Sequence, residues 1–330
     1  MLGKRMKNTK GTLMLTTSFD RRQFLAAAPV LVAGGCQPAM PKPQTIVITP
    51  NPEAEPELSR ALGVTTGSFV KHLTTQPTNG KLVMLDLPKI LRDELDMTVL
   101  DLMTATLPSL EPGYCEQFRN AAERAGCVIT NLKMNQANLD MASADPELRR
   151  QSLETYRKTI DAAARLGCRW VRPASGKARP DQEKLASAYR ELIDYAGPKG
   201  ITLLIENNGW IRDDPDAIPQ VIKAVGAGLA AQPDTGNWTV KSRYEGLRKA
   251  FPVAATCDFK ALTLGPGGEH TDYELRKCFD IAWQAGFRGP WCFEHFHESL
   301  PMLFKEMARL RDWLSGWMTE ADEPQQKATK

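Results

Sequence analysis

Short apolar runs alternate with amphipathic stretches from about residue 60 onward. The apolar runs have the length of strands, and the stretches between them repeat hydrophobic residues at helical spacing. Several of these stretches end at a glycine, such as Gly126 or Gly167, as helices commonly do. The predicted strands cover residues 62–69, 98–103, 128–134, 169–172, 201–206, 229–232, 253–260 and 291–294. The predicted helices cover residues 116–125, 146–166, 181–197, 215–225, 244–250, 271–285 and 300–314.

This alternation predicts an α/β fold with a single (β/α)8 TIM barrel over residues 58–318. Eight strands that alternate with helices over about 260 residues match the size of one such barrel. A doubly wound open sheet is the alternative architecture, and it would need a glycine-rich phosphate turn after an early strand. The glycine-rich segment of this chain, residues 265–268, comes late and is interpreted as a loop between the seventh strand and its helix.

The first 36 residues have the layout of an export signal. Arg21 and Arg22 precede an apolar run over residues 24–33, as in a signal peptide with a charged and then a hydrophobic region. The Arg-Arg-x-Phe-Leu core resembles a twin-arginine signal, which implies a periplasmic or otherwise extracytoplasmic location. A basic N-terminal tail without a targeting role is the alternative.

The end of this leader allows two kinds of processing. Residues 31–36 finish with small residues and Cys36, which resembles a lipoprotein cleavage box, so that either a lipid anchor at Cys36 or simple cleavage is open. Residues 37–57 contain six prolines and are predicted to form an extended linker. Residues 319–330 are assigned to a polar tail.

The charge distribution excludes a general nucleic-acid surface. The 330 residues carry 42 Lys and Arg against 39 Asp and Glu, a net charge of +3. The leader holds six of the basic side chains and one acidic side chain, so the rest of the chain has a net charge of −2. A nearly neutral body argues against a nucleic-acid or anionic-membrane partner. No apolar run of about 18 residues occurs after the leader, so no spanning helix is predicted there.

The supply of cysteine and histidine limits the metal chemistry. Apart from Cys36 there are six cysteines without a Cys-x-x-Cys pair, and we expect buried free thiols, although an even number in an exported protein would also permit disulfides. Only four histidines are present, which is a poor supply for a multi-zinc site.

Carboxylates recur at the ends of four successive predicted strands. Glu206 ends the fifth strand, Asp234 follows the sixth, Asp258 lies in the seventh and Glu294 ends the eighth. In a TIM barrel these strand ends meet at one mouth. Carboxylates that converge repel one another unless a cation or protons neutralise them. An all-oxygen set of ligands suits Mg²⁺ or Mn²⁺, so the sequence predicts a divalent metal site.

These segments resemble the xylose isomerase-like barrel superfamily of sugar isomerases and epimerases over about residues 60–315. The segments that carry the resemblance are Ile-Glu206-Asn, Pro-Asp234-Thr-Gly-Asn237, Asp258-Phe-Lys260 and Phe-Glu294. In that family a Glu, an Asp, a His and a second Glu bind one divalent metal, and the two glutamates also act as acid and base. The resemblance therefore implies Glu206, Asp234 and Glu294 as ligands, with Glu206 and Glu294 as catalytic groups.

Two positions depart from the family pattern. Asp258 stands where the family has its histidine ligand, and Asn237 replaces a common histidine three residues after the strand-six aspartate. Asp258 can still bind a metal and would favour Mg²⁺ or Mn²⁺. The alternative is a degraded metal site in a barrel that only binds a sugar.

The resemblance implies a sugar or sugar derivative as substrate, converted by proton abstraction next to a carbonyl. Isomerisation or epimerisation is the leading reaction, and a dehydratase or lyase acting on a keto-sugar or cyclitol is the alternative. Lys260 is predicted to stabilise the developing negative charge, and Arg172 to hold a substrate oxygen, unless both only pair with the carboxylates. Further substrate-binding candidates are Asn208, Asn237, Trp238, His270 and His297, and for Trp238 and the histidines a packing or structural role is also open.

Overall fold

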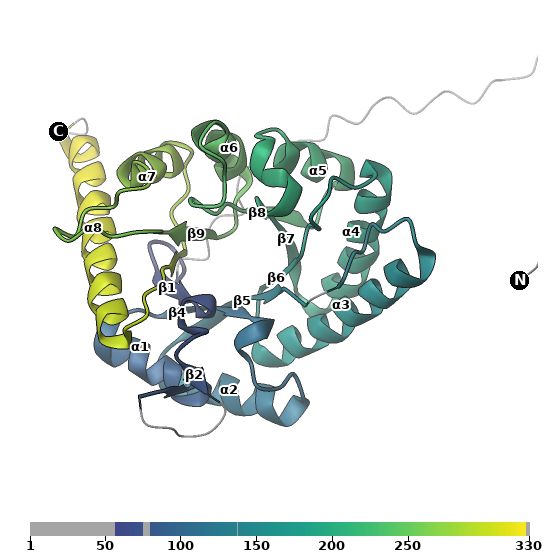
Figure 1. Ribbon diagram of the computed structural model, residues 1–330, viewed down its shortest axis with the longest axis horizontal. Helices are drawn as coiled ribbons and strands as arrows, with labels where there is room; N and C mark the ends of the chain where they lie inside the picture. Colours follow the sequence, from purple (N-terminus) through teal and green to yellow (C-terminus); the bar gives the residue numbers. More distant parts are fainter. Residues whose placement is uncertain (1–56, 75–79, 137, 328–330) are drawn as a thin grey trace, which may run out of the picture. The chain divides into compact units, whose positions relative to one another are not determined.

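The computed structural model describes residues 57–74, 80–136 and 138–327, and these residues form an α/β barrel (Figure 1). The eight parallel strands of its main sheet follow the order β8-β7-β6-β5-β4-β1-β10-β9. Their bounds are β1 Leu62–Thr65, β4 Val99–Met103, β5 Val128–Met134, β6 Trp170–Pro173, β7 Thr202–Glu206, β8 Leu229–Gln232, β9 Cys257–Lys260 and β10 Trp291–Glu294. A separate two-stranded sheet pairs β2, Leu73–Thr74, with β3, Leu82–Val83.

Helices surround the strands as an outer layer (Figure 1). Their bounds are α1 Leu87–Leu95, α2 Pro112–Arg124, α3 Pro146–Leu166, α4 Gln182–Ala196, α5 Ala217–Val225, α6 Arg243–Ala250, α7 Leu275–Gln284 and α8 Leu300–Lys327. Short 3-10 segments cover Thr66–Phe69, Met84–Asp86, Thr104–Thr106, Gly197–Lys199, Gly209–Asp213 and Phe251–Val253. Within the described residues, no helix combines the length and the hydrophobicity that crossing a membrane requires.

The two edge strands of the order, β8 and β9, meet through single bridges, which is how the barrel closes. Ala231 pairs with Ala254 and Asp234 with Asp258, both in parallel. The amide of Asp258 donates to the carbonyl of Pro233 at 2.9 Å, and that of Thr235 donates to the carbonyl of Asp258 at 3.0 Å. The predicted (β/α)8 fold class is therefore confirmed, and the two aspartates lie side by side at the closure.

Local sequence signals explain why the elements begin and end where they do. Asp145 caps α3, since its carboxylate accepts from the amide of Glu147 at 2.9 Å, and Pro146 occupies the first turn. Gly167 ends the same helix at φ 81°, a conformation that glycine adopts without strain. The bounds of α3, β5, β8 and β10 agree with the predicted ranges.

Two of the predicted strands are much shorter in the structure, and one helix was not predicted. The strand predicted over residues 62–69 ends at Thr65, and the one predicted over 253–260 begins only at Cys257. The 3-10 turn Thr66–Phe69, with its buried Phe69, fills the rest of the first range, and the 3-10 turn Phe251–Val253 ends at the first residue of the second. Apolar character alone does not separate a strand from such a turn. The helix α1 is an element that the sequence pattern did not reveal.

The last helix is longer than predicted, because α8 continues through most of the range assigned to a polar tail. Leu310, Leu314 and Met318 are buried at spacings of four residues, so the apolar face continues past the expected end. Asp322 pairs with Arg60 at 2.6 Å, and α8 contacts both α1 and α7.

An apolar layer between strands and helices forms the core. Trp291 of β10 lies among Phe259, Phe279 and Phe287, with ring centroids 4.9 to 5.6 Å apart. All six cysteines of the described residues are buried and free, as expected.

Gly63 in β1 is a position where only glycine fits. A Cβ at this residue would lie 2.2 Å from the carbonyl oxygen of Val99 on β4. We expect Gly63→Ala to lower the free energy of unfolding by about 1–3 kcal/mol in urea titrations, because the backbone of a core strand must shift. Gly113→Ala in α2 is the matched control, since nothing lies within 4 Å of its added Cβ, and it should leave stability unchanged or raise it. Equal effects of the two substitutions would contradict the prediction.

Candidate active site

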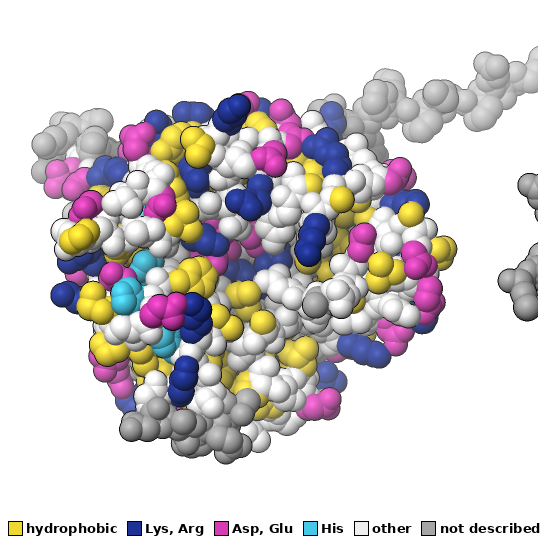
Figure 2. Space-filling model, viewed as in Figure 1, with side chains coloured by type: hydrophobic (Ala, Val, Ile, Leu, Met, Phe, Trp, Pro, Cys, Tyr) yellow, Lys and Arg dark blue, Asp and Glu magenta, His cyan; other side chains and the backbone are white. Residues whose placement is uncertain are grey.

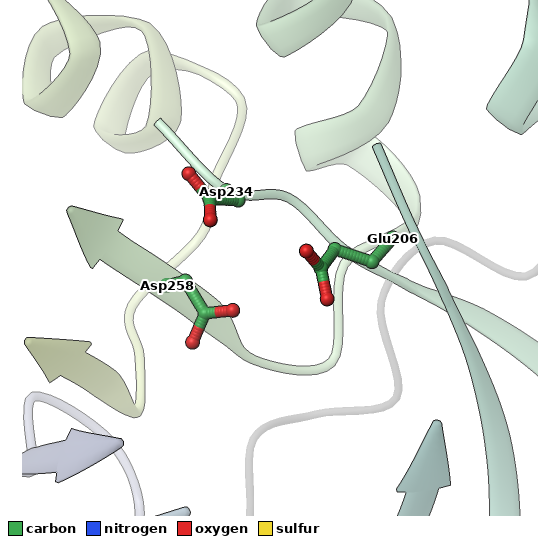
Figure 3. Close-up of side chains that lie close together, drawn as sticks. All are labelled: Glu206, Asp234 and Asp258. Atoms are coloured by element: carbon green, nitrogen blue, oxygen red, sulfur yellow. The ribbon is translucent and has the colours of Figure 1, made fainter. Parts of the chain in front are cut away.

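Three carboxylates converge where β7, β8 and β9 end (Figure 3). Glu206 is the last residue of β7, Asp234 follows β8 and Asp258 lies in β9. One oxygen from each lies within 4.8 Å of the others, and all three side chains are buried. Asn207 fixes the relative position of the first two strand ends, because its side chain accepts from the amide of Asp234 at 2.7 Å and donates to the carbonyl of the same residue at 2.9 Å.

Asp234 is held by the turn that follows it. Its Oδ1 accepts from the amides of Gly236 at 2.7 Å and Asn237 at 2.9 Å, and its Oδ2 lies 3.5 Å from Nζ of Lys260. Burial raises the pKa of Asp234 to about 6, although Lys260 opposes the shift. Ionisation of this carboxyl is therefore unfavourable unless a further cation lies close to it.

Glu206 has a cation on one side and an amide on the other. Its Oε2 lies 2.8 Å from Nε of Arg172 on β6, and its Oε1 accepts from Nδ2 of Asn237 at 2.8 Å. The Arg172 contact does not have the alignment of a hydrogen bond, so Oε2 is a buried carboxylate oxygen without a hydrogen-bond donor. Such an oxygen has room for a metal ion among its remaining lone pairs.

Glu294 lies beside Lys260 rather than in the triad of Glu206, Asp234 and Asp258. Nζ of Lys260 is 2.9 Å from Oε1 of Glu294 and 3.1 Å from Oδ1 of Asn237. Burial opposes ionisation of Glu294, but Lys260 and Lys133 outweigh it and lower the pKa of that carboxyl. Burial likewise opposes the charge of Lys260, and Asp234 and Glu294 outweigh it, which raises the pKa of that ammonium. The pair is therefore ionic.

A buried polar network adjoins the triad, and the sequence reasoning missed it. Nζ of Lys133 on β5 lies 2.6 Å from Oδ1 of Asp258 and donates to Oγ1 of Thr65 at 2.8 Å. Asp101 of β4 accepts from Asn131 and from Gln232, whose Nε2 is 2.9 Å away. The signal that could have revealed it is a polar side chain at alternate positions of an apolar strand, here Asn131 and Lys133 in β5.

With every group counted as ionised, the formal charges of this group leave a surplus of two negative charges. Five carboxylates, those of Asp101, Glu206, Asp234, Asp258 and Glu294, face the three cations Lys133, Arg172 and Lys260. Burial raises the pKa of Asp258 well above its usual value even though Lys133 opposes the shift. A divalent cation would neutralise the surplus, and the oxygen-only donors of the triad suit Mg²⁺ or Mn²⁺. The residues present therefore fit such an ion.

Of the remaining predicted site residues, some lie beside the triad and one is packed away from it. Arg172 is buried in its ion pair with Glu206, and Asn208 is half-buried next to the triad. Trp238 is 1% exposed and packs against the backbone of Gly246 in α6. Its predicted role in stacking on a sugar is therefore not supported, because neither face of the ring is free.

The two predicted histidines have backbone partners. His270 contacts the carbonyl of Tyr273 through Nδ1 at 2.8 Å and accepts from the amide of Leu262 through Nε2 at 3.1 Å, so it orders the loop after β9. His297 accepts from the amide of Ser299 at 2.8 Å just before α8. It also lines a surface cavity of about 260 Å³ together with Ser68, Lys71, Phe296 and Glu298.

Figure 2 looks onto the face of the molecule where these strand ends open, and charged side chains of both signs lie in its central hollow.

The family model for the xylose isomerase-like TIM barrel matches residues 94–319, more than half of the chain. The chain belongs to the xylose isomerase-like TIM barrel family.

Similar proteins within and around this family act on sugars or bind magnesium. L-ribulose-5-phosphate 3-epimerase UlaE of Salmonella typhimurium is 28% identical over 204 residues, which cover 55% of this chain and 69% of that protein. An L-ribulose 3-epimerase structure aligns over 82% of this chain and 98% of its own, with a TM-score of 0.66 and 15% identity. A xylose isomerase-like protein from Mycobacterium smegmatis, in complex with magnesium, aligns over 80% and 97%, with a TM-score of 0.57 and 21% identity.

Asp234 gives this xylose isomerase-like barrel a testable pH dependence. Its pKa is raised from 3.8 to about 6, so the fold holds the proton more tightly than the unfolded chain, and this stabilising contribution is lost as pH rises through about 6. Without divalent cations, we expect Asp234→Asn to be more stable than the native chain by about 1–3 kcal/mol above neutral pH. The difference should shrink as pH falls through about 6 towards about 4.

Urea unfolding with a chelator, over a pH series, measures this difference. Asp93→Asn, on the exposed side of α1, is the control for loss of one carboxylate. A native chain that is the more stable at every pH would contradict the expected sign.

Proposed function

We propose that this chain is a sugar isomerase or epimerase in which Glu206 and Glu294 exchange a substrate proton. The observation that carries the proposal is the arrangement of these two glutamates in one buried group, with Lys260 in contact with Glu294 and Asp234, and Arg172 in contact with Glu206. The sugar epimerases among the similar proteins support the same reaction class. A D-psicose 3-epimerase from Clostridium cellulolyticum H10, with D-tagatose, aligns with a TM-score of 0.61 at 14% identity.

The chemistry needs a base, a charge sink and an acid. A hydrogen on the carbon next to a carbonyl is weakly acidic, so one carboxylate takes this proton while the electron pair moves to the carbonyl oxygen. Glu294 has a lowered pKa and is ionised, as a base must be. Lys260 supplies positive charge beside it for the developing oxyanion. In an epimerase the second glutamate starts this step protonated and gives its proton to the opposite face of the same carbon. In an isomerase the proton goes to the former carbonyl carbon, and the hydroxyl proton of the deprotonated carbon moves to the former carbonyl oxygen, so that the new carbonyl forms.

A divalent cation, Mg²⁺ or Mn²⁺, is part of the proposal. Glu206, Asp234 and Asp258 would hold it, and when bound it would supply a fixed positive charge for a substrate oxygen. Two observations support it, namely the surplus of two negative charges and the buried oxygen of Glu206 that lacks a hydrogen-bond donor. Burial of the group inside the barrel excludes water and so strengthens each of these interactions.

A sugar-binding barrel without catalysis is the second candidate, and one contact favours it. Lys133 already neutralises Asp258 at 2.6 Å, which leaves that carboxylate less available to a metal than the other two. A dehydratase or lyase would use the same proton abstraction, followed by loss of a neighbouring oxygen, and differs from an epimerase in its product.

The glutamates can be tested by proton exchange in heavy water. We expect Glu206→Gln and Glu294→Gln each to reduce deuterium incorporation into ketopentoses and ketohexoses by about a hundredfold or more, because an amide cannot carry the proton. Glu298→Gln, an exposed residue near the same rim, is the matched control and should retain exchange. Near-native exchange in either glutamine variant of the pair would refute the mechanism.

The same assay separates catalysis from binding. Removal of divalent cations with a chelator should abolish exchange in the native chain, and Mn²⁺ should restore it. Sugar binding without any exchange, with and without Mn²⁺, would favour the non-catalytic barrel.

We also propose that the protein is exported through the twin-arginine signal, with a lipid anchor at Cys36 as one outcome of its processing; these positions lie outside the described residues. Replacement of Arg21 and Arg22 by lysines keeps the charge, so a loss of the extracytoplasmic fraction in cell fractionation would support the signal. Arg5→Lys is the control. If Cys36 bears a lipid, Cys36→Ala should move the protein from the membrane to the soluble fraction.

A further inference from the structure

Lys133 is a buried cation whose hydrogen bonds are all directed at protein oxygens. Its side chain is 2% exposed and reaches Oδ1 of Asp258 at 2.6 Å, Oγ1 of Thr65 at 2.8 Å and Oδ1 of Asp101 at 3.6 Å. Two of its three N–H groups donate hydrogen bonds, to Asp258 and Thr65, and Asp101 lies at ion-pair distance, so protein groups enclose this ammonium. Lys133 is therefore not a group that binds substrate, and any effect on the site passes through Asp258.

The contact with Asp258 sets what this carboxylate can offer a cation. Its Oδ1 is bound by Lys133, and its Oδ2 lies 3.3 Å from Nε2 of Gln232, a weaker contact. Glu206 is also paired with a cation, since its Oε2 lies 2.8 Å from Nε of Arg172, but this contact lacks the alignment of a hydrogen bond. Each member of the triad thus has its own cation, and the pair of Asp258 with Lys133 on β5 has the shortest contact of the three.

We propose that Lys133 is a specificity-determining residue of the cation site, a built-in counter-ion that favours one divalent ion over ions of higher charge. The inference rests on the proposed metal site and goes beyond it. With Lys133 the group of five carboxylates and three cations has a charge of −2, and without it the charge would be −3. Because the repulsion grows with the charge of the ion, Lys133 disfavours a trivalent ion more than a divalent one.

Substitution by methionine tests this directly, since methionine has a similar length and no charge. We expect Lys133→Met to bind Mn²⁺ about tenfold more tightly than the native chain and Tb³⁺ about thirtyfold more tightly, because the electrostatic gain scales with ion charge. Calorimetric titration of the metal-stripped full chain measures Mn²⁺, and sensitised luminescence measures Tb³⁺. Both are recorded at mildly alkaline pH, where protons compete least for the carboxylates, and neither requires activity.

Two further variants separate charge from shape. Lys133→Arg keeps the charge and should keep the preference for Mn²⁺ over Tb³⁺. Asp101→Asn combined with Lys133→Met returns the group to −2 without altering the triad, so its affinities should return to within about threefold of the native values. Asp101→Asn alone should bind both ions more weakly. Since Lys133→Met leaves buried carboxylates without their partner, comparing the double variant with Asp101→Asn also measures the effect of Lys133 if the single variant does not fold.

The outcomes distinguish this inference from the proposed function. Native Mn²⁺ binding with unchanged affinity and selectivity in Lys133→Met would overturn the role of Lys133 and leave the metal site intact. Binding only after Lys133 is removed would support its role as a counter-ion and overturn metal dependence of the native protein. An absence of binding in every variant would overturn both.

Discussion

The structure depends on the burial of opposite charges inside the barrel. A buried carboxylate without compensation costs several kcal/mol, so each one here contacts a cation or polar hydrogens. Lys133 links β5 to β9, Arg172 links β6 to β7, and Lys260 links β9 to β10. Lys260 also lies 3.5 Å from Asp234, which follows β8, so it spans the closure where β8 and β9 meet by single bridges. The charged site and the closure of the barrel are therefore parts of one arrangement.

This arrangement also explains why binding of a ligand at the site would be favourable. Burial raises the pKa of Asp234 and Asp258 despite their lysine partners, so the protein holds both carboxylates against the preference of their surroundings. A cation or an electron-deficient substrate group relieves this cost when it binds. Such a carboxylate is destabilising in the free protein and useful in the complex, which is the relation expected between stability and activity.

The sequence predicted those features that depend on local pattern or on barrel topology. The strands β5, β8 and β10 agree with their predicted bounds because apolar runs between polar turns define them. The carboxylates could be predicted to meet because parallel barrel strands end at one face. The contact of Lys133 with a residue 125 positions later, and the packing of Trp238 on Gly246, depend on three-dimensional register that no local pattern carries.

The departure from the family pattern at Asp258 becomes understandable when it is considered together with Lys133. A histidine at this position would be a neutral ligand, whereas Asp258 adds a negative charge and Lys133 adds a positive one 2.6 Å away. The Asp–Lys pair is therefore neutral as a whole, and the group retains the charge it would have with a neutral ligand and no lysine. In charge, Asp258 together with Lys133 is equivalent to one neutral side chain. In the proposed metal site, this neutral pair therefore leaves the charge of the group unchanged, which is the electrostatic condition for binding a divalent cation.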